Sequence, residues 1–463
     1  MSIIWDSNTL REIANAKSNK DWKVTGLEID SRQVKKGDLF CAIKGSKLDG
    51  HNFINGAIKN GAAACLVSSS SNLLNKIAFA EVKNVFKAIE KMATEGRKRS
   101  KAKFIAVTGS VGKTGTKEMF RTCFSKITKI FVNQNSFNNH IGVPVSLSQI
   151  PKSSSFCVLE IGMNKKGEIK KLSELVKPDL AIITAVEQSH LQGLKSLKNI
   201  ALAKSEILYS LPKNGCFIFN KDTNFSEMLN DKAVKLQINN IISYGKSDEA
   251  DIRLIDFKLS NNFYFIKANC FNKIIEWKMP AIGEHWVHNS LSIIATGLFY
   301  NLDIPSILTA LKSFKLPDGR GNTIKLKLRG KDFWIIDDSY NSNPASLTAS
   351  LNHLAKVNNK GKKILVLGDM LELGEKSLEL HQSFKSQIDT DQINVLFTVG
   401  QYMKELYKII GNDLKKYHDD NLNSLSLKLK SIIDKDDVVL IKGSNSMNLK
   451  KIIKNMMNED MII

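Results

Sequence analysis

The segment FIAVTGSVGKTGTKEMF, residues 104–120, constrains the fold of this chain more than any other. It reads as a strand, a glycine-bearing loop, a Lys-Thr pair and a helix. Glycines let backbone N–H groups approach phosphates, and the following helix presents its positive end to them. Lys113 is then able to reach the β- and γ-phosphates, and the Thr114 hydroxyl is suited to Mg²⁺. The segment therefore predicts a bound and cleaved nucleoside triphosphate, although Val107 replaces the first glycine of the general GxxxxGKT pattern.

The rest of the chain predicts an α/β protein of three domains, as its 463 residues also indicate. Residues 1–100 mix short strand-like runs (KGDLFCAIKG, AAACLVSS) with turns and end in the basic segment EGRKRSKAK. Residues 101–316 alternate strands with amphipathic stretches, which is typical of a P-loop ATPase-like parallel sheet covered by helices. Residues 317–463 begin in the linker or hinge KLPDGRGN and contain the apolar runs KKILVLGDM, NVLFTVG and DVVLIKGS. They predict a Rossmann-like domain without a dinucleotide loop.

Composition narrows the functional classes. Six cysteines are scattered without a CxxC pair, so we interpret them as reduced core residues of a cytoplasmic protein. No apolar run approaches the ~18 residues that cross a bilayer, and the N-terminus is not typical of a secretory signal. The net charge of +21 is typical of nucleic-acid binding, but the lysines are spread along the chain without a nucleic-acid-binding motif. We therefore expect an anionic small substrate, no nucleic acid and no membrane insertion.

A series of motifs follows the phosphate loop: SFNNHIGVPVSL, EIGMN, SHLQGLKS, ALAKSEIL, GEHWVHNS, DGRG, DDSYNSNPAS, LGDMLELG and KGSNSM. Together with TGSVGKTGTK, this series resembles the Mur ligase family, whose loop also lacks the first glycine. IDSRQVKKGDLFCAIKG and DGHNFINGAIKNGA resemble the family's uridine-nucleotide domain, so the resemblance covers nearly the whole chain. Within the family, DDSYNSNPAS and LGDMLELG are similar to the members that add D-alanyl-D-alanine.

The resemblance implies a cytoplasmic, monomeric ligase of cell-wall synthesis. Such an enzyme joins D-alanyl-D-alanine to UDP-N-acetylmuramoyl-tripeptide through an acyl phosphate and forms ADP and phosphate. The implied cofactors are ATP and two Mg²⁺ ions, with a carbamylated lysine at Lys204, because a lysine ammonium cannot ligate a metal. The implied catalytic residues are Lys113, Glu160, His190, Lys204 and Arg320, and the implied metal ligands are Thr114, Glu160, His190 and Lys204.

The resemblance also implies residues that bind ATP and the UDP-linked substrate. The ATP-binding residues are Gly109, Ser110, Val111, Gly112, Lys113, Thr114, His285, Asn289, Arg320, Asp337, Tyr340 and Asn341. The substrate-binding residues are Ser31, Arg32, Lys44, Asn138 and Asn139. Two positions depart from the family pattern, because Glu284 and Asn445 stand where the family has arginine.

Two alternatives stay open at this point. Another Mur-type ligase would add a single amino acid such as diaminopimelate, lysine or glutamate instead of the dipeptide. A P-loop protein of a different class would use its basic surface on nucleic acid, with a steep salt dependence and no ATP turnover. The third residue of the tripeptide, diaminopimelate or lysine, is open as well.

Overall fold

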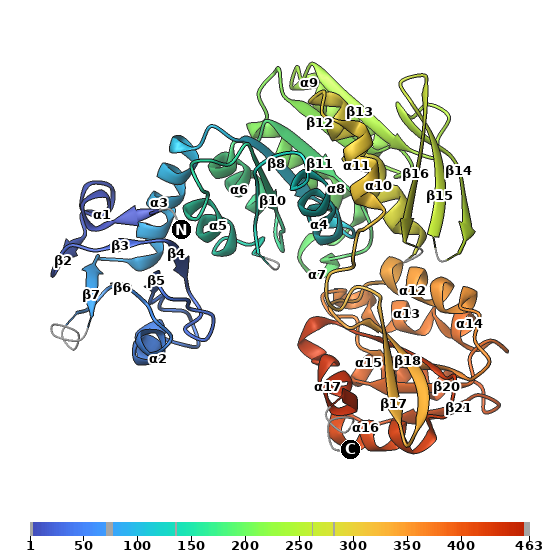
Figure 1. Cartoon of the computed structure of the whole chain (residues 1–463). Helices are drawn as coiled ribbons and strands as arrows, with labels where there is room; N and C mark the ends of the chain where they lie inside the picture. The colour runs from blue at the N-terminus through green and yellow to red at the C-terminus, as the bar shows by residue number, and fades with distance from the viewer. Residues whose placement is uncertain (1–2, 71–76, 135–136, 262, 281–282, 458–463) are drawn as a thin grey trace.

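The computed structural model describes residues 3–70, 77–134, 137–261, 263–280 and 283–457. The chain forms three α/β lobes, which we name N-terminal, central and C-terminal (Figure 1). Each lobe surrounds its own main sheet, and these sheets lie within residues 17–81, 103–280 and 322–442. This architecture confirms the predicted three-part α/β fold.

The N-terminal lobe contains a five-stranded sheet in the order β2-β7-β6-β5-β4 and a β1-β3 ribbon. Strands β4 to β7 run parallel, and β2 pairs antiparallel with β7. The predicted runs KGDLFCAIKG and AAACLVSS form β5 and β6. The elements are β1 (Trp5–Asp6), α1 (Ser7–Ala14), β2 (Lys17–Ser18), β3 (Lys23–Val24), β4 (Gly26–Glu28), β5 (Asp38–Cys41), η1 (Gly50–Phe53), α2 (Ile54–Lys59), β6 (Ala64–Val67), β7 (Ala78–Glu81) and α3 (Val85–Arg99).

The central lobe contains a nine-stranded sheet in the order β16-β15-β14-β13-β12-β11-β8-β10-β9. Its strands from β8 to β14 run parallel, as predicted, whereas β15 and β16 add an antiparallel extension that the strand-helix alternation did not indicate.

The first elements of this lobe are β8 (Lys103–Thr108), α4 (Lys113–Phe124), β9 (Ile130–Val132), α5 (Gly142–Ser148), β10 (Phe156–Glu160), α6 (Glu168–Val176), β11 (Leu180–Ile183), α7 (Leu191–Leu194), α8 (Leu197–Lys204) and η2 (Ser205–Ser210). The later ones are β12 (Cys216–Asn220), α9 (Ser226–Lys235), β13 (Asn240–Gly245), β14 (Ile252–Ser260), β15 (Phe263–Cys270), β16 (Lys273–Pro280), α10 (Glu284–Phe299) and α11 (Ile304–Leu311).

The C-terminal lobe contains a six-stranded sheet in the order β17-β18-β22-β19-β20-β21, parallel except for the β17-β18 hairpin. The three predicted apolar runs form β19, β20 and β22. The elements are β17 (Asn322–Leu328), β18 (Lys331–Asp338), α12 (Pro344–Lys356), β19 (Lys363–Gly368), η3 (Gly374–Lys376), α13 (Ser377–Gln382), α14 (Lys385–Ile388), β20 (Val395–Val399), α15 (Gln401–Ile409), β21 (Lys415–His418), α16 (Leu422–Ile432), β22 (Val438–Lys442), η4 (Asn445–Met447) and α17 (Lys450–Met457).

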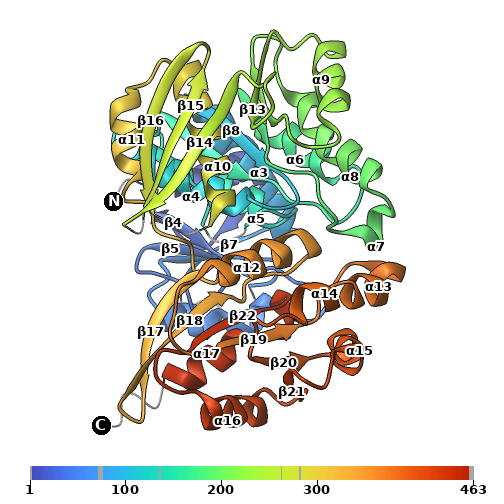
Figure 2. The same cartoon turned by 90° about the vertical axis from the view of Figure 1, so that its right-hand side faces the viewer.

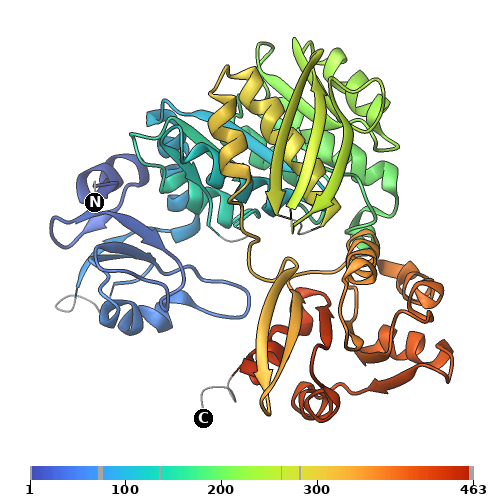
Figure 3. The same cartoon turned by 45° about the vertical axis from the view of Figure 1, so that its right-hand side comes forward.

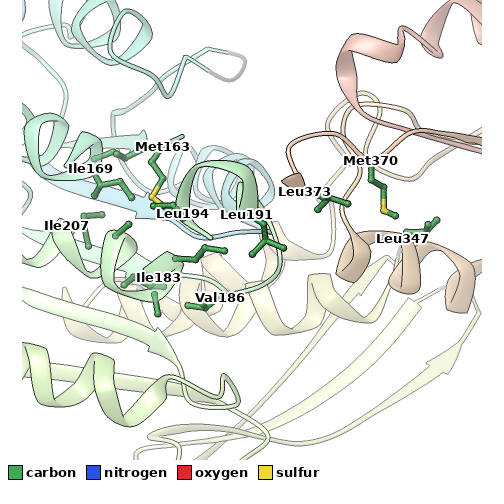
Figure 4. Close-up of a cluster of buried hydrophobic side chains, with 14 of the residues drawn as sticks. Met163, Ile169, Ile183, Val186, Leu191, Leu194, Ile207, Leu347, Met370 and Leu373 are labelled. Carbon is green, nitrogen blue, oxygen red and sulfur yellow. The ribbon is translucent and has the colours of Figure 1, made fainter. Parts of the chain in front are cut away.

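The central and C-terminal lobes face each other across an interface. The chain crosses once between them, from α11 to β17 through the predicted hinge segment (Figure 3). Helices α12 and α13 lie on the side of the C-terminal lobe that faces the central lobe (Figure 2). A cluster of buried apolar side chains includes residues of both lobes, and Leu191 and Leu373 approach the interface from opposite sides (Figure 4).

All six cysteines are buried and unpaired, which confirms that they are reduced core residues. Burial raises the pKa of the Cys65 and Cys123 thiols to about 12, so they stay protonated at neutral pH. In the part of the chain that the structure describes, no helix has the length and apolar character needed to span a bilayer.

Candidate functional site

The phosphate loop joins β8 to α4 at the carboxyl edge of the central sheet. Gly109 has a φ of 154°, and a β-carbon there would collide with the Thr184 hydroxyl. Gly112 has a φ of 86°, which favours glycine, and precedes the helix. The Ser110 hydroxyl donates to the Glu187 carbonyl and accepts from the Glu187 N–H, both at 2.9 Å. The loop is therefore fixed against the segment that follows β11. The N-terminus of α4 lies at the carboxyl edge of the sheet.

Lys113 begins α4, and its ammonium donates to the Gly109 carbonyl at 2.6 Å. Desolvation lowers the pKa of Lys113, while the charge of Glu160 opposes that shift and the guanidinium of Arg320 adds to it. A triphosphate bound by this loop would offer the ammonium anionic partners in place of the carbonyl.

Glu160 ends β10, which lies beside β8, so its carboxylate reaches the first turn of α4. It is 1% exposed, and it accepts hydrogen bonds from the Thr114 hydroxyl at 2.8 Å and from the Asn138 amide at 2.7 Å. The structure therefore brings together three predicted site residues from three segments. Asn139 instead accepts from the Ile141 and Gly142 N–H groups at the start of α5. The first residue of its motif, position 136, lies outside the described residues.

Asn133 is a buried residue of this site that the motifs did not indicate. Its side-chain oxygen accepts from the Glu160 N–H at 3.2 Å, and its amide donates to the Phe137 carbonyl at 3.0 Å. Its own carbonyl accepts from the buried Lys117 ammonium at 3.0 Å. Asn133 thus connects the strand that carries Glu160 to the loop that carries Asn138.

His190 and Lys204 are the other two predicted metal ligands. His190 precedes α7 with a left-handed backbone, and its Nδ1 lies 2.6 Å from Oε2 of Glu372 in the C-terminal lobe. The His190 ring lowers the pKa of the Glu372 carboxyl. Lys204 ends α8 and is 1% exposed; desolvation, with a smaller effect of Lys113, holds its pKa well below the ordinary value. No contact of either side chain with Thr114 or Glu160 is present within the described ranges.

A pocket of about 400 Å³ opens between the central and C-terminal lobes beside the phosphate loop, a volume suited to a nucleotide. Predicted residues line it: Ser110, Val111, Gly112, His285, Asn289, Arg320 and Asn341. The buried amide nitrogen of Asn289 has no hydrogen-bond partner among the described residues, so it is available to a ligand. Desolvation lowers the pKa of His285 to about 4, which leaves the imidazole neutral at physiological pH.

The DDSYNSNPAS segment begins in the last two residues of β18 and ends in the first turn of α12, which Asn343 caps. Asp338 lines the pocket, whereas the predicted Asp337 points elsewhere and accepts from the Ser339 N–H and hydroxyl. Successive strand residues face opposite sides, which explains the difference of one position. Asp338 also accepts from the Lys442 ammonium at 2.7 Å. The ring of Tyr340 lies 4.3 Å from the Arg320 guanidinium rather than in the pocket lining.

Arg320 reaches from the hinge segment into the central lobe, where its guanidinium donates to the Thr114 hydroxyl at 3.0 Å. The two departures from the family pattern lie apart from this contact. Glu284 begins α10 and pairs with Lys356 of α12 in the C-terminal lobe. Asn445 begins η4 and is exposed.

The predicted residues for the UDP-linked substrate lie in the N-terminal lobe. Ser31 and Arg32 follow β4, and Lys44 follows its parallel neighbour β5, so all three lie at one edge of the sheet. The exposed Arg32 guanidinium is held by Asp30 at 2.7 Å, which lowers the pKa of that carboxyl to about 2. The structure does not bring these residues into contact with the phosphate loop.

Several pocket residues were missed by the motif analysis. Asn220 ends β12, Asp222 and Thr223 follow it, and His288 and His353 come from α10 and α12. The run CFIFNKDT carried a usable signal, because polar residues directly after a parallel strand lie at the ligand-binding edge of the sheet.

Comparisons with known proteins cover all three lobes. Family profiles match for the Mur ligase family, catalytic domain (residues 23–107), the Mur ligase middle domain (107–297) and the Mur ligase, glutamate ligase domain (319–445). A UDP-N-acetylmuramoyl-tripeptide–D-alanyl-D-alanine ligase of Rickettsia prowazekii is 33% identical over 97% of this chain and 99% of its own length. The ligase of the same name from Bacillus subtilis is 32% identical over 94% of this chain and 93% of its own.

Solved structures agree with the sequence matches. A crystal structure of MurF from Acinetobacter baumannii superposes with a TM-score of 0.82 at 26% identity and covers 99% of both chains. MurF ligase from Thermotoga maritima in complex with ADP has the same fold, with a TM-score of 0.76 at 24% identity over 94% of this chain and 98% of that chain. With motifs, profiles and fold in agreement along its length, the chain belongs to the Mur ligase family.

Proposed function

We propose that this chain is an ATP-dependent ligase that joins D-alanyl-D-alanine to UDP-N-acetylmuramoyl-tripeptide in peptidoglycan synthesis. The observation that carries the proposal is the similarity, over nearly the full length, to ligases of that name. The motif DDSYNSNPAS, which predicts the dipeptide-adding type, forms one wall of the pocket beside the phosphate loop. A single-amino-acid ligase of the same family is the alternative that the assay below distinguishes.

The first step is phosphoryl transfer. An oxygen of the tripeptide's terminal carboxylate attacks the γ-phosphorus of ATP, and the bond to the ADP oxygen breaks, which leaves an acyl phosphate. Two anions must meet, so cations dominate what the site has to supply. We assign this work to Lys113 on the phosphate loop and to Arg320, whose guanidinium already contacts Thr114. We assign Asn289 and His285, which line the pocket, to the adenine side.

The second step forms the amide. The amine nitrogen of D-alanyl-D-alanine attacks the acyl carbon and loses a proton, and inorganic phosphate leaves. Water would hydrolyse the acyl phosphate, so the C-terminal lobe has to cover the site during both steps. We assign Asn138 to the reacting carboxylate of the substrate. Its amide donates to the Glu160 carboxylate beside the phosphate loop, which shows that the amide lies close to this loop and can donate to a carboxylate.

The donor set fits a magnesium ion. The hydroxyl of Thr114 and the buried carboxylate of Glu160 are hard oxygen ligands next to the phosphate loop. We assign His190 and a carbamate on Lys204 to a second ion. When bound, Mg²⁺ would offset the charge of the phosphates.

The carbamate on Lys204 has a chemical basis. Lys204 is buried, with no hydrogen-bond or ion-pair partner among the described residues, and burial favours its neutral amine. A neutral amine adds CO₂ and releases one proton, which converts the side chain into an anionic oxygen donor.

The three lobes divide this work. We propose that residues 1–100 bind the UDP-linked peptide through Ser31, Arg32 and Lys44. Residues 101–316 bind ATP, and residues 317–463 bind the dipeptide side and close the site. A monomer suffices, because each assigned residue comes from this one chain. ATP and UDP-linked precursors are cytoplasmic compounds, so we place the reaction in the cytoplasm.

Phosphate release by the purified protein tests the proposal. With ATP, Mg²⁺ and UDP-N-acetylmuramoyl-tripeptide, release should require D-alanyl-D-alanine. Lys113→Ala should lower the rate by about 100-fold or more, because a cation at the transferring phosphoryl group is lost. Lys126→Ala is the matched control, since Lys126 is an exposed lysine just after the same helix. Release with a single amino acid and none with the dipeptide would contradict the proposal.

A further inference from the structure

The loop 369–374 of the C-terminal lobe contacts the segment 190–193 of the central lobe. Nδ1 of His190 lies 2.6 Å from the half-exposed Glu372 carboxylate, an ion-pair distance at an angle outside hydrogen-bond geometry. The Gln192 N–H donates to the Glu372 carbonyl at 3.0 Å. Leu191 and Leu373 belong to the apolar cluster at the same interface (Figure 4). Glu372 therefore contacts the central lobe through both its backbone and its side chain.

Both partners hold an uncommon backbone conformation. The φ of His190 is 57° and that of Glu372 is 65°, in the left-handed region that residues other than glycine seldom adopt. Such a conformation is strained for a residue with a β-carbon and persists where the surrounding structure requires it. The two strained residues contact each other across the interface, so the surrounding structure holds both backbones in this arrangement.

Hydrogen bonds within the C-terminal lobe also fix the loop 369–374. The Met370 N–H donates to Nε2 of the buried His381 at 2.8 Å, and the Leu371 N–H donates to the Ser444 hydroxyl at 2.8 Å. The carboxylate of Asp369 accepts from the Met403 N–H at 2.8 Å. Glu372 is thus presented to the central lobe by a loop with fixed neighbours.

We propose that Glu372 is a positioning residue that orients the His190 imidazole for metal binding when the C-terminal lobe docks on the central lobe. A carboxylate this close to Nδ1 favours a proton on that nitrogen, and a small rotation of the ring on metal binding would complete the hydrogen bond. The other nitrogen, Nε2, is then left for a metal. Glu372 comes from the lobe opposite to His190, so this orientation is complete only when the two lobes are in contact. The proposal rests on the assignment of His190 to a metal in the proposed function.

The chemical consequence is a link between closure and metal affinity. The partner that sets the orientation of a ligating histidine typically contributes 10–100-fold to metal affinity. An enzyme with this arrangement binds its second ion weakly while the lobes are apart and tightly once they meet. Phosphoryl transfer would then begin only after the site is covered, which protects the acyl phosphate from water.

Glu372→Gln tests the proposal, with Glu375→Gln as the matched control, because Glu375 is an exposed glutamate just beyond the same loop. In the presence of ADP, Glu372→Gln should weaken the binding of Mn²⁺, followed by its electron paramagnetic resonance signal, by about 10-fold or more. The Mg²⁺ concentration for half-maximal phosphate release should rise by a similar factor, and saturating Mg²⁺ should restore most of kcat. Glu375→Gln should match the parent in both measurements.

A second background separates positioning from other roles. In a His190→Ala protein, Glu372→Gln should have no further effect on Mn²⁺ binding, because the ring that it orients is absent. Parent-like Mn²⁺ binding by Glu372→Gln, or an equal loss in both backgrounds, would overturn the proposal. The parent's dipeptide-dependent phosphate release is measured separately, so a failed ligase assignment is distinguishable from a failed role for Glu372.

Discussion

At the scale of single residues, Asn133 has no proposed role in the chemistry, but its hydrogen bonds hold the backbone around Glu160. It is fully buried and partners the Glu160 N–H and the Phe137 carbonyl. Asn133→Leu should lower the free energy of unfolding by about 2–4 kcal/mol, because the buried Glu160 N–H and the part-buried Phe137 carbonyl lose their partners. Urea denaturation measures this change, with Gln134→Ala as the control at an exposed neighbouring amide. Parent-like stability of Asn133→Leu would show that the two groups find other partners.

The predictability of individual residues depended on how they act. Lys113, Thr114 and Glu160 were predictable because a loop pattern and a strand end specify them from local sequence. Asn133 and Glu372 act through partners 27 and 182 positions away, which no local pattern contains. Asp338 rather than Asp337 lines the pocket, because the pleat of β18, and not the motif, decides which carboxylate faces it.

At the scale of elements, the loop 369–374 depends on the protonation of a buried histidine. His381 accepts from the Met370 N–H through Nε2, and its Nδ1 lies 2.5 Å from the Ser377 carbonyl, so the folded state requires the neutral ring. Desolvation lowers the pKa of His381 below its ordinary 6.5. The unfolded chain therefore takes up the proton first, and stability falls as the pH drops from about 6.5 towards the lower folded value.

His381→Gln should remove part of this pH dependence. Between about pH 7.5 and about pH 5.5, the parent should lose more free energy of unfolding than the variant, by up to about 1.4 kcal/mol per pH unit within the titration window. Denaturation at the two pH values measures the difference, and His140→Gln, at an exposed histidine, should behave as the parent does. An identical pH slope for His381→Gln and the parent would argue against a neutral buried ring.

Among the elements, the parallel strands were predictable and the antiparallel ones were not. Strands such as β8, β10 and β19 are buried on both faces and read as continuous apolar runs. Strands β15 and β16 alternate buried and exposed residues over much of their length, so they differ little from amphipathic stretches. The basic run EGRKR belongs to the end of α3, where the guanidiniums of Arg97 and Arg99 lie over the rings of Phe104 and Trp5.

At the scale of the whole molecule, three pairs of polar side chains join the central and C-terminal lobes beside the apolar cluster. Arg320 contacts Thr114, Glu372 contacts His190, and Lys356 contacts Glu284. The third involves Glu284, which stands where the family pattern has arginine, and its charge suits the lysine that faces it. An exposed ion pair contributes about 0.2–1 kcal/mol, which is at most about a five-fold change in the closed-to-open ratio.

Lys356→Glu should therefore weaken closure modestly, because it sets two carboxylates against each other across the interface. In small-angle scattering with ADP and UDP-N-acetylmuramoyl-tripeptide, the variant should keep a larger radius of gyration than the parent, and the difference should shrink in high salt. The double variant Glu284→Lys, Lys356→Glu restores the opposite charges and should recover the parent's compaction. If the double variant stayed as open as Lys356→Glu, the loss of this ion pair would not be the cause of the weaker closure.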